Sequence, residues 1–334
     1  MGDKVVSEED LIQQFLVPLT DKVPGAYALK DDCATLRPPA GHDLVITTDA
    51  LVSGLHFLPD ETPEVIAWRA LAVNISDLAS KGATPMCYLM ALSVPEAPTR
   101  DWMIRFASGL KDAQEHYGLT LIGGDTDRRP GVSLSINITA VGYVPEGRMV
   151  QRATAQVGDR VFVSGTLGDA AMGLILRRNV DSKRFPTLNK DQRQFLLDRF
   201  LRPSARVELS SLLLKYASAA MDVSDGFVKD MGRMCSASGV AAQVILDHLP
   251  LSVAAERAFA EQPELRELAA NGGDDYEILA TVPANQADAF EDAALELGVA
   301  VTDVGKIAVG AGLTLLNANG LPVTLSKTGH DHFD

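Results

Sequence analysis

The chain has 334 residues, of which 46% are hydrophobic and 22% charged, so it can bury a substantial core and is long enough for two domains. Its formal net charge of −14 argues against a nucleic-acid backbone or an anionic membrane surface as the main partner. The cysteines Cys33, Cys87 and Cys235 are far apart with no C-x-x-C pair, which fits a reducing cytoplasm better than a disulfide framework.

Along the first half, strand patterns alternate with helix patterns, which is typical of an α/β or α+β architecture. The acidic N-terminal stretch predicts no signal peptide, and no segment approaches the ~18 apolar residues of a membrane helix. We predict strands over 43–52, 87–95 and 132–145, and helices over 61–83 and 99–118 that end at Gly82 and Gly118. The segment LTLIGGD, 119–125, predicts a short strand that runs into a glycine turn.

Turn residues and a fresh strand pattern follow between 145 and 160, so we place a domain boundary near Met149, giving domains 1–149 and 150–334. In the second half we predict strands over 159–165, 241–249, 275–282 and 300–308, helices over 168–178, 204–217 and 287–298, and a terminal hairpin around NANG, 317–320. The stretch 181–192 is predicted to be an exposed loop.

Acidic residues recur beside apolar segments in several separate places. They lie in KDDCA, TTDALVSGLHF, NISDLAS, IGGDTDRR, MDVSDG and NGGDDYE. A single aspartate at a strand end is more often a helix cap or a turn residue, but the repeated arrangement favours a site. Buried carboxylates need metal ions, basic partners or protonation, and oxygen ligands mixed with hydroxyls suit Mg²⁺, which also binds substrate phosphates.

No P-loop motif and no G-x-G-x-x-G after a strand is present, so those two ways of holding a phosphate are excluded. The remaining solution is Mg²⁺ held by aspartates, with arginine and backbone N–H groups completing the positive field. Arg152 in QRATAQVGD is a candidate for that role.

Taken in order, DDCA, TTDALVSGLHF, NISDLASKGATP, LIGGDTDR, RATAQVGD, DVSDG, NGGDDYEI and the terminal GHDHF resemble the thiamine-monophosphate kinase family of the PurM-like ATP-binding superfamily. The resemblance covers nearly the whole chain. It implies a PurM-like two-domain α/β (α+β) fold. The first domain would bind ATP and Mg²⁺ and form a homodimer through its mixed sheet, and a larger C-terminal α/β domain would follow.

The resemblance also implies a role for each matching residue. Metal ligands would be Asp32, Thr47, Thr48, Asp49, Asp77, Asp125, Asp222 and Asp225. ATP would be contacted by Tyr117, Gly124, Asp125, Arg152 and Ser224, and thiamine monophosphate by His56, Asp274 and His330. The implied reaction is in-line transfer of the γ-phosphoryl group of ATP to the phosphate of thiamine monophosphate, with Mg²⁺ and Arg152 neutralising charge and no strong general base.

The chain departs from the family pattern at three places. YALKDDCA lacks the glycines that usually precede the first acid pair, Asp274 stands where the family has glutamate, and His330 stands where an aromatic residue often precedes DHF.

Two other classes remain as alternatives. A sister synthetase, of the aminoimidazole ribonucleotide or selenophosphate type, would share ATP and Mg²⁺ but not the combination of LVSGLHF with NISDLASKGATP. A non-enzymatic cation-binding protein would carry contiguous EF-hand loops, and none is present. We therefore expect ATP, thiamine monophosphate and a second copy of the chain as partners in the cytoplasm, with no nucleic acid and no membrane.

Overall fold

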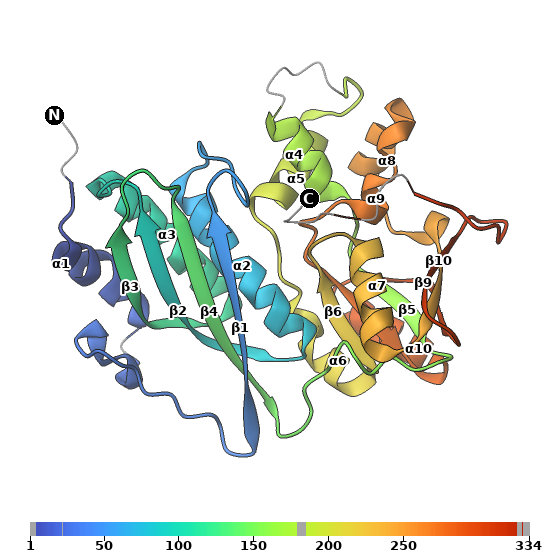
Figure 1. The fold of residues 1–334 in the computed structure, drawn as a ribbon, viewed down its shortest axis with the longest axis horizontal. Coiled ribbons are helices and arrows are strands. Elements are labelled where there is room, and N and C mark those ends of the chain that lie inside the picture. The colour runs from blue at the N-terminus through green and yellow to red at the C-terminus, as the bar shows by residue number, and fades with distance from the viewer. Residues whose placement is uncertain (1–4, 22, 179–184, 326–328, 330–334) are drawn as a thin grey trace. The chain divides into compact units, whose positions relative to one another are not determined.

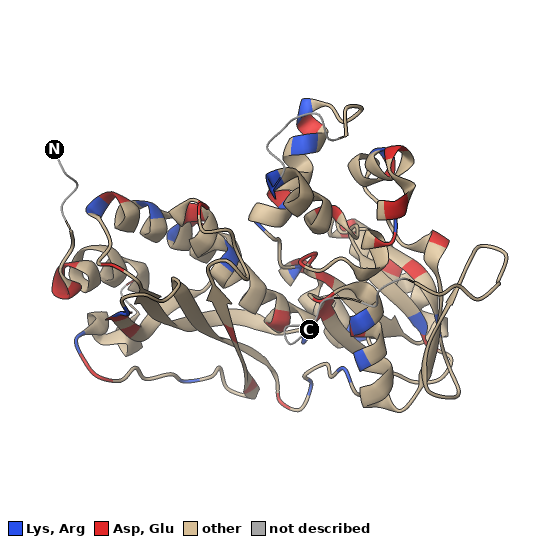
Figure 2. Ribbon diagram, turned by 45° about the horizontal axis from the view of Figure 1, so that its top comes forward, with Lys and Arg blue, Asp and Glu red and all other residues tan. Residues whose placement is uncertain are grey.

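The computed structural model describes residues 5–21, 23–178, 185–325 and 329, and the chain divides into two compact units (Figure 1). Unit 1 comprises Met1–Leu78 and Ala83–Arg148. Unit 2 comprises Ala79–Gly82 and Met149–Asp334. Acidic and basic residues occur on helices and loops of both units (Figure 2).

Unit 1 is built on a mixed four-stranded sheet with the strand order β1-β4-β2-β3. Its strands are β1 His42–Val52, β2 Thr84–Val94, β3 Thr120–Arg128 and β4 Ser135–Pro145. Only β2 and β3 pair in parallel among these strands, and the other neighbours are antiparallel. The helices α2 Pro63–Ser80 and α3 Arg100–Tyr117 cover one face of this sheet (Figure 1).

The alternation of side chains along β2 shows which face is covered. Tyr88, Met90 and Leu92 are at most 2% exposed, whereas Leu89 between them is 38% exposed on the opposite face. Since successive strand residues point to opposite faces, the first three pack toward the helices. Burying each such side chain contributes roughly 1.5–3 kcal/mol. The other face of the sheet is the open face of unit 1.

Part of that open face is covered by the N-terminal segment, which forms α1 Glu8–Leu11, a π-helical turn Ile12–Leu16 and 3₁₀ turns Val17–Thr20 and Pro24–Leu29. Ala26, Ala34 and Leu36 pack there against Cys87 of β2 and Val141 of β4. The remainder of the open face is therefore left for a cleft and for exposed side chains.

Unit 2 contains a six-stranded sheet with the order β10-β7-β9-β5-β8-β6, in which only β10 and β7 pair in parallel among the described strands. Its strands are β5 Arg160–Ser164, β6 Ala219–Val223, β7 Ala241–Ile245, β8 Glu277–Val282, β9 Val301–Ala308 and β10 Gly312–Leu316. Its helices are α4 Asp169–Arg178, α5 Lys190–Leu201, α6 Ser210–Tyr216, α7 Phe227–Ser238, α8 Val253–Glu261, α9 Leu268–Asn271 and α10 Ala287–Glu296.

Both faces of this sheet are buried. Val161 and Val163 of β5 belong to the cluster that includes Phe227 and Met231 of α7, whereas Phe162 belongs to the cluster formed with α6 and α10. A third cluster joins α4, α5 and α8. Among the described residues, none of the helices has both the length and the apolar character that a membrane span requires.

The predicted strands and helices are largely confirmed, and α3 shows why. The hydroxyl of Thr99 accepts a hydrogen bond from the N–H of Trp102 at the start of the helix, and Gly118 ends the helix with φ +72°. The prediction of a glycine turn after 119–122 is wrong, because β3 continues through Gly123 and Gly124 to Arg128 and accommodates them at an irregularity of its pairing with β2.

Three predictions in the second half are also corrected. The helix predicted over 204–217 begins with a 3₁₀ turn, and α6 spans only Ser210–Tyr216. The loop predicted over 181–192 lies partly outside the described residues, and its described part buries Phe185 and Leu188 before α5 begins at Lys190. The hairpin predicted around 317–320 is reduced to a turn and one isolated bridge, since β10 pairs with β7 instead.

Candidate functional site

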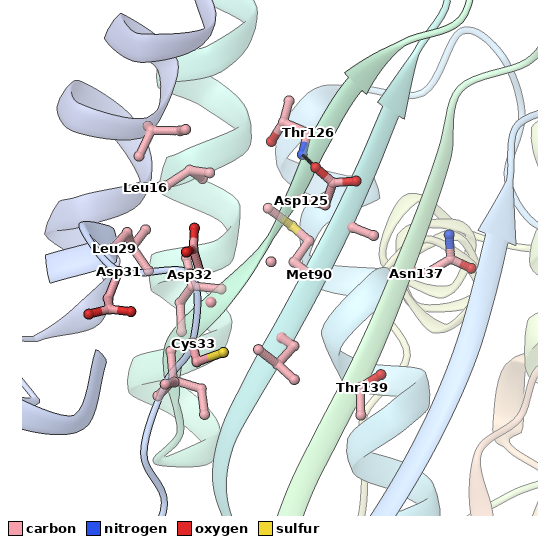
Figure 3. Close-up of a pocket in the computed structure, with 18 of the residues that line it drawn as sticks. Leu16, Leu29, Asp31, Asp32, Cys33, Met90, Asp125, Thr126, Asn137 and Thr139 are labelled. Carbon is pink, nitrogen blue, oxygen red and sulfur yellow. Dashed lines mark hydrogen bonds between the residues drawn. The ribbon is translucent and has the colours of Figure 1, made fainter. Parts of the chain in front are cut away.

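A cleft of about 700 Å³ opens on the open face of unit 1. The segment that carries Leu29, Asp31 and Asp32 bounds it on one side, and strands β2, β3 and β4 bound it on the other (Figure 3). Asp125 of β3 lines the same cleft. The cleft thus combines an apolar wall with several oxygen donors, which is the usual make-up of a small-molecule site.

The backbone before the acid pair takes an uncommon conformation. Tyr27, Ala28 and Leu29 have φ angles of +48°, +51° and +55°, in the left-handed region that favours glycine. This is where the sequence lacks the glycines of the resembled pattern. The chain therefore makes the turn with non-glycine residues, at a cost on the order of 1 kcal/mol for each.

Gly124 of β3 pairs with Met90 of β2. A β-carbon on Gly124 would be 1.9 Å from the carbonyl oxygen of Met90, so no side chain fits at this position. The neighbouring Asp125 carboxylate accepts a hydrogen bond of 2.9 Å from the N–H of Thr126 (Figure 3). Glycine at this position therefore allows β3 to pair closely with β2 beside Asp125, and both residues line the cleft.

A second group of predicted metal ligands lies between β1 and α2. The hydroxyl of Thr47 donates a hydrogen bond of 2.5 Å to Oδ2 of Asp77. The N–H of Asp49 donates one of 2.9 Å to Oδ1 of Asn74, one turn earlier on the helix. Thr47 and Asp49 are two residues apart on the strand, and Asn74 and Asp77 are three residues apart on the helix. These spacings place each strand residue next to its partner on the helix.

Thr48 lies apart from this group. Its hydroxyl donates to the carbonyl oxygen of Ile138 at 3.0 Å and accepts from the hydroxyl of Thr139 at 3.2 Å, both on β4. Because strand residues alternate, its side chain is on the open face while those of Thr47 and Asp49 point to α2. The structure therefore does not bring all three β1 side chains to one side of the sheet.

His56 lies in the turn that follows β1. Its Nδ1 accepts a hydrogen bond of 2.9 Å from the N–H of Val52. An imidazole that accepts at Nδ1 carries its proton at Nε2, so the ring offers a donor on its other side. Tyr117, by contrast, is 5% exposed, packs against Trp68 with 5.6 Å between ring centroids and does not occur among the described residues that line the cleft.

In unit 2, the DVSDG loop connects β6 to α7. Oδ2 of Asp230, on the first turn of α7, accepts hydrogen bonds of 3.0 Å from the N–H groups of both Ser224 and Asp225. Burial raises the pKa of the Asp230 carboxyl to about 6. The carboxylate of Asp225 pairs with Arg233 at 2.5 Å, and Asp222 at the end of β6 is 6% exposed.

The N-cap position of α7 is Gly226, which provides no side-chain cap, so neither Asp222 nor Asp225 is the N-cap residue of this helix. Asp230 satisfies the loop N–H groups instead.

The NGGDDYE segment runs into β8 beside this loop. Asp274 and Tyr276 have φ angles of +71° and +51°, and the hydroxyl of Tyr276 donates to Oδ1 of Asp274 at 3.2 Å. Asp275 is buried, and burial raises the pKa of its carboxyl to about 8, although it accepts hydrogen bonds from the N–H groups of Gly168 and Ala170.

The two remaining residues that were predicted to contact the substrates are Arg152 and His330. Arg152 is exposed in the loop before β5, where its carbonyl oxygen accepts a hydrogen bond from the hydroxyl of Ser238. His330 lies outside the described residues.

Comparison with known proteins assigns the chain to a family. Residues 30–144 match AIR synthase related protein, N-terminal domain, and residues 156–316 match AIR synthase related protein, C-terminal domain. Thiamine-monophosphate kinase of Salmonella typhimurium is 41% identical over 304 residues, which cover 91% of this chain and 90% of that protein. The chain belongs to the thiamine-monophosphate kinase family. Thiamine-monophosphate kinase of Caulobacter vibrioides is 39% identical over 98% of this chain and 91% of that protein.

Solved structures agree with this membership. Thiamine-monophosphate kinase from Stenotrophomonas maltophilia K279a has a TM-score of 0.79 at 41% identity, covering 88% of this chain and 90% of that one. AaThiL complexed with AMPPCP and TMP has a TM-score of 0.77 at 32% identity, covering 97% of both chains. HypE of E. coli, with a TM-score of 0.76 at 21% identity, shares the fold alone. The PurM-like fold expected from the sequence is confirmed.

The side chains of this chain can be compared with the ligands that the Mg²⁺ implied for a thiamine-monophosphate kinase would need. Among the described residues, no three His, Cys, Asp or Glu side chains form a ready-made metal cage. The donors are carboxylate and hydroxyl oxygens, such as the Thr47–Asp77 pair. Mg²⁺ is usually bound by one or two carboxylates, waters and substrate phosphates, so this donor set fits it in chemistry.

Several residues around these sites were missed in the sequence. They are Asp230 and Arg233 on α7, and Glu277 with its partners Arg199 and Arg206. Asp230 has a local signal, since it follows Asp225 by five residues on the helix that begins there. Arg199 and Arg206 have none, because they reach Glu277 from 78 and 71 residues away.

Proposed function

We propose that this protein transfers the γ-phosphoryl group of ATP to the phosphate of thiamine monophosphate, giving thiamine diphosphate and ADP. The observation that carries the proposal is the similarity, over 97% of both chains, to AaThiL complexed with AMPPCP, an ATP analogue, and TMP. Family membership at 41% identity supports it, and the sister synthetases of the superfamily are not favoured.

The attacking group in this reaction is a phosphate oxygen that is already anionic. No strong general base is needed, and the protein has to position the two phosphates and offset their charge. The acidic side chains of this chain cannot offset that charge by themselves. Arg152, exposed in its loop, is the side chain we assign to the transferring phosphate.

Mg²⁺ would supply the remaining positive charge. In unit 1 we assign Asp32 and Asp125 in the cleft, and Thr47, Asp49 and Asp77 between β1 and α2, as its ligands. In unit 2 we assign Asp222 and Asp225. Thr48, whose side chain is on the open face, would contribute from that side.

For ATP we assign Gly124 and Asp125 in the cleft and Ser224 in the DVSDG loop, together with Arg152. Tyr117 stays a prediction, since its 5% exposure leaves little surface for a ligand. For thiamine monophosphate we assign His56, whose Nε2–H is a donor, and Asp274. His330 stays a prediction from the sequence.

We further propose that the chain forms a homodimer through the open face of unit 1. Ile46 of β1 is 63% exposed on that face, and Leu89 of β2, which also lines the cleft, is 38% exposed. Exposed apolar side chains on a regular sheet are typical of an interface between copies. The free thiols Cys33, Cys87 and Cys235 fit a reducing compartment, and we assign the protein to the cytoplasm.

The proposed reaction is tested with purified protein, ATP and Mg²⁺, offered either thiamine monophosphate or free thiamine. We expect ADP and thiamine diphosphate from the monophosphate and no product from thiamine, measured by chromatography. Equal turnover of free thiamine, or ADP release independent of the acceptor, would contradict the proposal.

A further inference from the structure

A buried group of charged side chains is centred on Glu277, the last residue of the NGGDDYE segment of unit 2. The carboxylate of Glu277, fully buried, accepts hydrogen bonds from Arg206 at both oxygens, with Nε at 2.7 Å and Nη2 at 2.5 Å. Arg199 donates to the same carboxylate at 2.7 Å, and the hydroxyl of Ser164 donates at 2.6 Å. We call Glu277, Arg199 and Arg206 the Glu277 cluster.

The burial of this cluster is costly. The side chains of Arg199 and Arg206 are only 11% and 23% exposed. Removing charges from water costs several kcal/mol for each ion, and a buried ion group is often no more stable than an apolar one of the same shape. Its hydrogen-bonding geometry, however, fixes the position of the residues it holds far more narrowly than apolar packing would.

The cluster fixes the backbone on either side of Asp274 and Tyr276. Nη2 of Arg199 also donates to the carbonyl oxygen of Asp275 at 3.0 Å. The Asp275 side chain is held in turn by the N–H groups of Gly168 and Ala170 at the start of α4. Asp275 and Glu277 are thus anchored by hydrogen bonds. Asp274 and Tyr276, the residues with left-handed φ angles, alternate with them along the chain.

Such a backbone does not persist without support. Left-handed φ angles such as those of Asp274 and Tyr276 are unfavourable for residues other than glycine, and they are kept only where the surroundings determine them. Gly165 shows how closely the surroundings fit, since a β-carbon there would lie 2.2 Å from Oε1 of Glu277. The cluster therefore has the position and the contacts needed to hold this conformation.

The anchored segment also holds the DVSDG loop. The N–H of Asp274 donates to the carbonyl oxygen of Ser224 at 2.9 Å, and the N–H of Tyr276 donates to that of Val223 at 2.8 Å. The residue assigned to the acceptor and the loop assigned to the metal are thereby joined through two backbone hydrogen bonds.

We propose that the Glu277 cluster is a positioning device for the acceptor: it sets the left-handed backbone that aims Asp274 at thiamine monophosphate, and it touches neither substrate. The inference rests on the proposed function for the identity of the acceptor. Its structural part, the control of the Asp274 and Tyr276 backbone, can be measured without any substrate.

The test compares Arg206→Lys and Glu277→Gln with Arg105→Lys. The control also breaks a two-point ion pair, because Arg105 donates to both oxygens of Glu64 at 2.6 and 3.0 Å in unit 1. Amide hydrogen exchange of Asp274 and Tyr276 is measured below the melting temperature of every variant. We expect at least ~10-fold faster exchange at these two amides in the cluster variants and none of this change in the control.

Steady-state kinetics supply the second measurement. We expect the KM for thiamine monophosphate to rise roughly 10-fold in Arg206→Lys and the KM for ATP to rise less, because Asp230 also holds the DVSDG loop, through the N–H groups of Ser224 and Asp225. Unchanged exchange at both amides, or an equal rise of both KM values, would overturn the proposal. If the wild-type protein did not phosphorylate thiamine monophosphate, the proposed function would fail, and the exchange measurement would still decide the role of the cluster. Arg199→Lys replaces Arg206→Lys if the latter does not fold.

Discussion

The hydroxyl of Thr47 on β1 lies 2.5 Å from Oδ2 of Asp77 on α2, so two motifs that are 30 residues apart meet through one hydrogen bond. Asp49, two residues along the same strand, is tied by its N–H to Asn74 on the same helix. Strand and helix together form a small group of oxygen atoms whose positions are constrained by these two hydrogen bonds.

A variant of Asp77 can distinguish a purely structural role of this carboxylate from a metal-binding role. We expect Asp77→Asn to lower kcat by about 10²-fold or more, because it removes a ligand charge where phosphoryl charge is neutralised. The melting temperature should hardly change, since the amide oxygen of asparagine can still accept from Thr47. Turnover is measured across a Mg²⁺ titration. Full activity with the same Mg²⁺ dependence would assign Asp77 to structure alone.

The DVSDG loop gives a second test. We expect Asp225→Asn and Asp222→Asn each to lower turnover by about 10²-fold. Stability should change little in Asp225→Asn, because Arg233 keeps its ion pair with Asp230 at 2.8 Å. The matched control is Arg233→Lys, which weakens the Asp225 pair and keeps the carboxylate. Wild-type turnover in both asparagine variants would remove these carboxylates from the metal site.

The roles of the two ring nitrogens of His56 can be tested separately. We expect His56→Ala to raise the KM for thiamine monophosphate more than the KM for ATP. In His56→Asn the side-chain oxygen can replace Nδ1 as acceptor for the Val52 N–H, but no donor replaces Nε2. This variant should therefore keep the melting temperature and still lose acceptor affinity. A rise confined to the KM for ATP would move His56 to the nucleotide.

Asp275 predicts a dependence of stability on pH. Its pKa is raised to about 8 in the folded state, from about 3.8, by burial. The folded state thus binds a proton that the unfolded state has released, and stability is lost as the pH rises from about 4 through 8. We expect the melting temperature of the wild type to fall more steeply between pH 5 and 9, in about this window, than that of Asp275→Asn. Identical slopes would show that this carboxyl is already ionised at pH 5.

The assembly is tested on the open face of unit 1. Ile46→Glu places a charge on this apolar face and should convert a dimer to a monomer, measured by light scattering at micromolar concentration. Leu295→Glu is the matched control, since Leu295 is 69% exposed on α10 of unit 2. A monomeric wild type, or a dimer unaffected by Ile46→Glu, would contradict this interface.

Local patterns were sufficient for most of the fold. The helices α2 and α3 were predictable because their apolar residues recur with helical spacing and because glycines end them. α5 also had a sequence signal, the capping box of Asn189 and Gln192, which was overlooked. The burial of Phe185 and Leu188 could not be predicted, since they are buried in a cluster with residues of α4, α5 and α8, some of them distant in the sequence.

For the candidate site, the sequence identified the acidic residues but not their surroundings. The alternation of β1 could have separated Thr48 from Thr47 and Asp49, because period-two patterning is local. The continuation of β3 through Gly124 could not be predicted, since the reason for the glycine is the nearby Met90 carbonyl of another strand. The pairing of Asp225 with Arg233 and the Glu277 cluster likewise depend on tertiary contacts.

Asp230 has a further consequence for ligand affinity. Its carboxylate holds the N–H groups of Ser224 and Asp225 from within α7, so the loop backbone is tied to the helix that carries the acid. A loop that is ordered beforehand saves the entropy that a flexible one loses on binding, about 0.5–1.5 kcal/mol for each immobilised side chain. The free energy of nucleotide binding is then available for contacts with the phosphates, and Asp230→Asn should weaken nucleotide binding chiefly by making that binding entropically less favourable.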